Sequence, residues 1–142
     1  MSEARPPLPR GLQLLGWSGT LPFIATLGVA VLEPGLRSSA IVAFIAYGAV
    51  ILSFLGGTRW GSGLASAAHP LRFLESVIPS LLAFAALLLV HEPGLGLLLL
   101  AAGFLAWALI DVFDPRWPHA YRRMRLAITG LVLALHAAWL VV

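Results

Sequence analysis

Residues 52–63 read Leu-Ser-Phe-Leu-Gly-Gly-Thr-Arg-Trp-Gly-Ser-Gly, a run that places one arginine, Arg59, among glycines inside a long apolar segment. A charged side chain within a bilayer costs ~2.5–3.5 kcal/mol on insertion scales, so it persists where it has a partner, a wet cavity or a reachable interface. The run therefore predicts a membrane-embedded helix, and it predicts that other parts of the chain provide a polar environment for Arg59.

The composition of the whole chain is also that of a membrane protein. Of its 142 residues, 60% are hydrophobic and 11% are charged, whereas a soluble domain has about 25% charged residues. A transmembrane helix needs roughly 20 mainly apolar residues. Nearly all of the chain after residue 10 divides into such segments. We expect an all-α, polytopic integral membrane bundle of five transmembrane helices, with no separate soluble domain.

Proline and glycine mark the boundaries of the expected spans. Pro22 lies in the middle of the first apolar segment and should kink it. The turn Glu33–Leu36 has proline and glycine at its central positions, which favours a type II turn. Ser38 or Ser39 is a competent N-cap for the next helix. The expected organisation is an N-tail over residues 1–10 and one domain over residues 11–142, with spans at about 11–32, 38–68, 73–90, 94–111 and 124–142.

The second of these spans is longer than the hydrocarbon core of a bilayer. It should end at His69-Pro70, because the residue before proline disfavours helix. If it is fully helical, its roughly 29 residues extend ~43 Å, so it must tilt, protrude or break. Any break is expected at Gly56-Gly57, because glycine has a low helix propensity. In the third span, Glu75 is expected in the first turn, where a carboxylate suits the helix dipole.

The arginines predict the orientation of the chain. Membrane proteins carry an excess of basic residues on the cytoplasmic side. The loops after the first and third spans lie on one side of the membrane and carry one arginine, Arg37. The N-tail and the loops after the second and fourth spans lie on the other side and carry seven: Arg5, Arg10, Arg72, Arg116, Arg122, Arg123 and Arg125. We expect a cytoplasmic N-terminus and an external C-terminus. All nine basic residues are arginine, which suits a bacterial inner (plasma) membrane protein from a GC-rich genome.

Several polar residues fall toward the cytoplasmic side and could form one cluster. Arg59 could pair with Asp111 or Glu75, because a planar guanidinium suits contact with a carboxylate. Two interpretations remain open. These residues could tie helices together and fix their depth, or they could form a vestibule for an anionic group such as phosphate. The candidate residues are Arg59, Trp60, Glu75, Asp111, Arg122 and Arg125.

Four glycines around Arg59 favour close helix contact. Gly57 and Gly61 have the spacing of the small-residue packing motif of membrane helices, and Gly56 and Gly63 widen it. The same glycines could instead let the backbone approach a ligand or water, although packing is the preferred interpretation.

His136 is a further candidate, because it should lie ~16 Å beyond Arg125 along the last span and hence near the middle of the membrane. A neutral histidine bonded to a neighbouring carbonyl or hydroxyl is the preferred interpretation. Haem ligation by two histidines would need a second buried histidine, and none is expected. We therefore predict no metal site and no cofactor.

The chain resembles a known family of small membrane proteins at several motifs. Residues 47–61 read Tyr-Gly-Ala-Val-Ile-Leu-Ser-Phe-Leu-Gly-Gly-Thr-Arg-Trp-Gly, which is similar to the signature of the family catalogued as domain of unknown function 3429, the transmembrane protein 69-like proteins. Pro22-Phe23, Ile78–Ser80 and Tyr121–Thr129 also resemble family features. The family typically has a Trp-Tyr pair before the last span, whereas here Ala120 precedes Tyr121. The resemblance implies the membrane architecture, and no activity comes with it.

For function, we expect a structural or accessory role, with docking on a larger membrane complex through the glycine face. The alternative is a small transporter or channel for an anionic solute or protons that uses Arg59 and the polar cluster. An enzyme is not expected, because the sequence has no catalytic motif such as Gly-x-Ser-x-Gly or His-x-x-x-His. The expected partners are the lipid bilayer and other membrane proteins or a second copy of the chain. Nucleic acid is not among them, because the arginines flank apolar spans rather than forming one soluble basic face.

Overall fold

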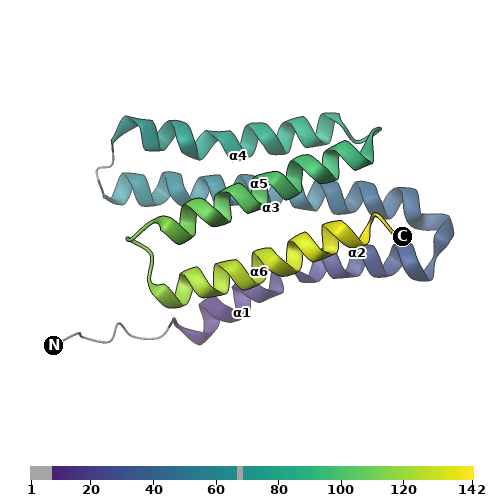
Figure 1. The fold of residues 1–142 in the computed structure, drawn as a ribbon, viewed down its shortest axis with the longest axis horizontal. Coiled ribbons are helices and arrows are strands. Elements are labelled where there is room, and N and C mark those ends of the chain that lie inside the picture. Colours follow the sequence, from purple (N-terminus) through teal and green to yellow (C-terminus); the bar gives the residue numbers. More distant parts are fainter. Residues whose placement is uncertain (1–7, 67–68) are drawn as a thin grey trace.

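The computed structural model describes residues 8–66 and 69–142, and over these ranges it contains helices and no strand. The described elements are α1 (Arg10–Ser18), α2 (Leu21–Leu32), the 3₁₀ turn η1 (Pro34–Leu36), α3 (Arg37–Ala65), α4 (Pro70–Leu88), α5 (Pro93–Phe113) and α6 (His119–Ala138). They lie side by side and alternate in direction along one long axis, with α1 and α2 together forming the first rod (Figure 1).

Four segments are long and apolar enough to cross a membrane: Arg10–Leu32, Pro34–Ala65, Pro70–Leu88 and Pro93–Phe113. The protein is therefore an all-α membrane protein. α6 lies along the same bundle and has a comparable length (Figure 1). It differs from the other four because its first turns carry Arg122, Arg123 and Arg125.

The first apolar segment is two helices rather than one kinked helix. α1 ends at Ser18 and α2 begins at Leu21, so the chain turns at Gly19-Thr20 and Pro22 falls in the first turn of α2. Proline is tolerated there, because the first N–H groups of a helix have no partner within it. The Tyr47 hydroxyl of α3 donates a hydrogen bond to the Gly19 carbonyl at 2.9 Å. This bond ties the break in the first rod to α3.

The entry into α3 differs from the prediction. The predicted type II turn is wrong, because residues Pro34–Leu36 form a 3₁₀ turn and Gly35 does not adopt the positive φ that a type II turn requires. The predicted serine cap is also wrong. α3 begins at Arg37 with Leu36 at the N-cap position and no side-chain cap, so Ser38 and Ser39 lie inside the helix.

α3 itself continues without a break from Arg37 to Ala65, through Gly56-Gly57. The span was expected to tilt, protrude or break, and it does not break at the glycines. The helix ends at Ala65, and the last part of the predicted span, residues 67–68, lies outside the described residues.

Three later helices begin earlier than predicted. α4 begins at Pro70 rather than near residue 73, and α5 begins at Pro93, because the fixed φ of proline suits the first helical position. Glu75 is consequently in the second turn of α4, and its predicted place in the first turn is wrong. α6 begins at His119 rather than at residue 124, so the arginine-rich segment is helical.

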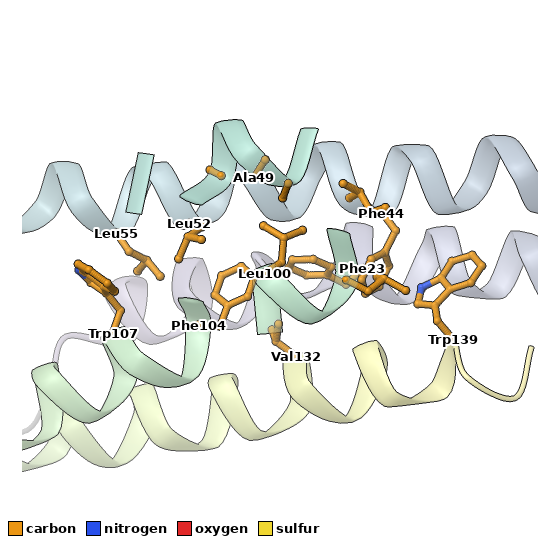
Figure 2. Packing of buried hydrophobic residues seen from close by; sticks show 14 of the residues in the cluster. Phe23, Phe44, Ala49, Leu52, Leu55, Leu100, Phe104, Trp107, Val132 and Trp139 are labelled. Atoms are coloured by element: carbon orange, nitrogen blue, oxygen red, sulfur yellow. The ribbon is translucent and has the colours of Figure 1, made fainter. Parts of the chain in front are cut away.

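The core lies along the middle of the bundle between α2, α3, α5 and α6 (Figure 2). Phe23 of α2 meets Phe44 and Phe104 edge to face, with ring centroids 4.9 and 6.1 Å apart. Glycine allows α5 to approach α3 closely, because a Cβ atom on Gly103 would lie 2.7 Å from Cδ2 of Leu52. This close approach brings the C-terminal halves of α3 and α5 together, where Arg59 and Asp111 lie.

Candidate functional site

Arg59 is the centre of the polar site. Its side chain projects from α3 into the bundle and is only 8% exposed. Nη1 lies 3.0 Å from Oδ1 of Asp111 on α5, and Nη2 lies 3.6 Å from Oε2 of Glu75 on α4. Both partners that the sequence suggested are therefore present, and Asp111 is the nearer and more buried of the two.

Asp111 joins Arg59 to a second buried arginine. Arg125 of α6 donates from Nε to Oδ2 of Asp111 at 3.2 Å, and from Nη1 to the Thr129 hydroxyl at 3.1 Å. Asp111 is 4% exposed and Arg125 is 7% exposed. The result is an Arg–Asp–Arg triad that connects α3, α5 and α6, in which one carboxylate serves two guanidinium groups.

Asp114 extends this cluster toward the loop after α5. Its carboxylate accepts hydrogen bonds from Nε of Arg116 at 2.9 Å, and it lies 3.8 Å from Nη1 of Arg72 and 3.9 Å from Nη1 of Arg59. Hydrogen bonding by the Arg116 side chain lowers the pKa of Asp114 to about 2, against the opposing effect of burial, and the same contact raises the pKa of Arg116. We call the residues Arg59, Arg72, Glu75, Asp111, Asp114, Arg116 and Arg125 the Arg59 cluster. It contains four guanidinium groups and three carboxylates.

Two of the candidate residues lie outside this cluster. Trp60 is exposed on the surface of α3, and its ring packs edge to face against Phe73 of α4, with centroids 5.0 Å apart. Arg122 instead donates from Nη1 to the Val112 carbonyl at 3.1 Å, which ties α6 to the end of α5.

The four glycines around Arg59 lie on two faces of α3. Gly56 and Gly63 are buried. A Cβ atom on Gly56 would come within 2.3 Å of the Ser76 carbonyl oxygen, so Gly56 allows the contact between α3 and α4. Gly57 and Gly61 are exposed, and a Cβ atom on either would meet nothing within 4 Å in the described part of the chain. They form an open face of α3, which we call the Gly57 face.

His136 is buried in an aromatic environment near the far end of the core. Its Nδ1 atom lies 2.8 Å from the Val132 carbonyl, and its ring is 4.8 Å from that of Phe44 and 5.8 Å from that of Phe104. Within residues 8–66 and 69–142, no three His, Cys, Asp or Glu side chains gather closely enough to hold a metal ion.

Two cavities adjoin the Arg59 cluster. The larger, of about 590 Å³, lies among α1, α2, α3, α5 and α6 and includes Arg125 in its lining. The smaller, of about 400 Å³, is lined by Arg59, Arg72 and Asp114 together with apolar residues of α5. A vestibule beside Arg59 is one of the two interpretations that the sequence leaves open, and the smaller cavity lies there. The larger cavity was not predicted, because it depends on how the helices pack. The partner of Arg125 within its own helix, Thr129, could have been found from its spacing of four residues.

Comparison with known proteins places the chain in a family. The model of the family described as "Protein of unknown function (DUF3429)" matches residues 8–141. The chain belongs to this family. The resemblance found in the sequence motifs is thereby confirmed, and it extends over both the Arg59 cluster and the two cavities.

A curated relative bears a name that agrees with the fold. Transmembrane protein 69 of Xenopus tropicalis is 38% identical over 84 residues, which cover 56% of this chain and 33% of that protein. The match thus spans about a third of the length of the relative. No solved structure matches the chain.

Proposed function

We propose that this protein has a structural or accessory role in a membrane and docks on another membrane protein or on a second copy of itself. The observation that carries this proposal is the pairing of Arg59. The arginine is buried, its nearest partner is Asp111 at 3.0 Å, and Asp111 in turn holds Arg125. The charge of Arg59 is thus used to connect helices of the bundle, and no catalytic role is proposed for it.

We further propose five crossings, with the N-terminus in the cytoplasm and the C-terminus outside, in a bacterial inner membrane. Two observations support the fifth crossing and the orientation. α6 runs along the other helices (Figure 1), and its arginines lie at the end that also carries Arg72 and Arg116. An excess of arginine at one end is typical of the cytoplasmic side.

The Gly57 face supports docking. Exposed glycines four residues apart allow a second helix to approach closely, and a Cβ atom on Gly57 or Gly61 would meet none of the described residues within 4 Å. Trp60 and Leu64 flank these glycines and are also exposed, so the face combines two glycines with large apolar side chains.

Substitution at neighbouring glycines tests docking separately from folding. In membranes from the native host, chemical crosslinking of the wild-type protein should give a defined larger species. Gly57→Leu should abolish that species and leave thermal unfolding in detergent unchanged, because Gly57 is exposed and a Cβ atom there would meet no described residue within 4 Å. Gly56→Leu is the control for packing and should lower the unfolding temperature, because it would collide with Ser76. Normal crosslinking of Gly57→Leu would exclude this face as the docking site.

The second candidate function is a small transporter or channel for an anionic solute or protons. The cavity of about 400 Å³ beside Arg59, Arg72 and Asp114 favours it, because a solute could reach two guanidinium groups there. Purified protein in liposomes should then carry anions or protons across the bilayer, and Arg59→Ala should stop the flux. Absence of flux in wild type and variant alike would remove this candidate.

A further inference from the structure

The cavity of about 590 Å³ has a polar end and an apolar end. Its deep part is lined by core residues, including Phe23, Phe104 and Val132, and its other end by Trp117, Met124 and Arg125. Small-molecule sites in proteins have volumes of ~300–1,000 Å³ and are mainly apolar with a few polar groups. This cavity has the size and the lining of such a site, and its two ends suit an amphiphile.

Two residues that line the polar end, Trp117 and Arg125, have hydrogen-bond donors without acceptors. Nη2 of Arg125 and Nε1 of Trp117 are both buried, and neither has a hydrogen-bond partner among the described residues. A buried donor left without a partner is unfavourable. Both groups are donors only, so the missing partner is an acceptor.

The local charge indicates that the acceptor is an anion. Asp111 is the only carboxylate in contact with Arg125 among the described residues, and it is shared with Arg59. The guanidinium of Arg125 is therefore incompletely neutralised. Arg122 and Arg123 add positive charge in the same turns of α6.

The bilayer is the nearest source of an anionic amphiphile. α1 forms one wall of the cavity through Leu12, Leu15 and Gly16, and none of its residues is buried. Leu12, Leu14 and Leu15 are exposed, so this wall is thin and apolar on its outer side as well.

We propose that this cavity binds one acyl chain of an anionic phospholipid, with headgroup oxygens that accept hydrogen bonds from Arg125 and Trp117. The chain lies against Phe23, Phe104 and Val132. This site is separate from the Gly57 face, so an experiment can refute the lipid site without refuting the docking role, and the reverse.

The test uses the full-length protein purified in a non-ionic detergent. Native mass spectrometry counts bound lipid, and thermal-shift titration gives the apparent affinity. The probes are phosphatidylglycerol, phosphatidylcholine with the same acyl chains, and inorganic phosphate. We expect one bound phosphatidylglycerol, held about tenfold more tightly than phosphatidylcholine, because the choline cation of the latter offsets the phosphate charge that attracts Arg125.

Three variants address the two ends of the cavity without removing a charge from the Arg59 cluster. Trp117→Phe keeps the aromatic ring beside Tyr121 and removes the N–H donor, so it should weaken phosphatidylglycerol binding by about tenfold. Thr58→Trp places a large side chain in the cavity and should abolish binding. Val50→Trp, on an exposed position of the same helix that does not line the cavity, is the matched control and should bind as wild type does.

Three results would overturn the proposal. Equal affinity for the two phospholipids would show that the net negative charge of the headgroup is not recognised. Equal protection by inorganic phosphate would show that the site binds a free anion rather than a lipid. Undiminished binding to Thr58→Trp, in a protein that unfolds at the wild-type temperature, would show that lipid binds elsewhere.

Discussion

Replacing Asp111 by asparagine removes the carboxylate that neutralises two buried arginines. Arg125 would keep only its hydrogen bond to the Thr129 hydroxyl, and Arg59 would keep Glu75 at 3.6 Å and Asp114 at 3.9 Å. Breaking a buried ion pair by removing one partner costs about 3–5 kcal/mol, because a charge is left buried and unpaired. We therefore expect Asp111→Asn to lower the free energy of unfolding by about 3–5 kcal/mol.

Two further variants show whether burial of charge is the cause. Glu75→Gln removes a carboxylate that is 49% exposed and only 3.6 Å from Arg59, so it should cost at most about 1 kcal/mol. The triple variant Arg59→Met, Asp111→Leu and Arg125→Met removes all three charges of the triad together. Apolar replacement of a whole buried triad is often neutral or stabilising by ~1–4 kcal/mol, so the triple variant should be at least as stable as wild type.

The measurement is reversible unfolding in mixed micelles, followed by circular dichroism and tryptophan fluorescence. A loss below about 1 kcal/mol for Asp111→Asn, the value of an exposed pair, would refute the structural role of the triad. A triple variant as unstable as Asp111→Asn would also refute it, because the loss could then not come from unpaired charge.

Two other predictions follow from the packing and from the acidic rim of the cluster. Gly103→Ala should lower the free energy of unfolding by about 1–3 kcal/mol, because its methyl group would meet Leu52. The control Gly130→Ala should raise the free energy of unfolding by about 0.5–1 kcal/mol, because a Cβ atom there meets none of the described residues within 4 Å. Equal effects of the two variants in the same unfolding assay would contradict the close approach of α5 to α3. The pKa of Asp114 is lowered from 3.8 to about 2 in the folded protein, so its contribution of about 2 kcal/mol is complete above its ordinary pKa and is lost as the pH falls through the folded one. Unfolding measured between pH 5 and pH 2 should show this loss in wild type and not in Asp114→Asn, and parallel curves would count against it.

The sequence was informative where local chemistry decides the structure. The cost of burying Arg59 was enough to name Asp111 and Glu75 as its partners, and both lie within ion-pair distance in the structure. The division of the chain into apolar helices was also predicted, from the apolar composition of the segments and from the prolines at their boundaries. The helix starts were less accurate, because Pro70 could be interpreted either as the end of one helix or as the start of the next.

Features that depend on the relative placement of helices could not be predicted. Arg125 reaches Asp111 because α6 begins at His119 and so brings the arginine alongside the end of α5. The sequence named Arg125 as a candidate residue of the polar cluster, but it did not identify Asp111 as its partner. The large cavity is lined by Gly19 and Thr20, at the break between α1 and α2, together with residues of α3, α5 and α6.

The unequal lengths of α3 and α4 have a consequence for the surrounding bilayer. α3 has 29 residues and α4 has 19, which correspond to ~43 Å and ~28 Å at the rise of a helix. The corner between α2 and α3 extends beyond the ends of α4 and α5 (Figure 1). A hydrocarbon layer of ~30 Å matches α4 but not α3. We therefore expect the lipid to be thicker on one flank of the protein than on the other, and the protein to favour membranes whose thickness can vary in this way.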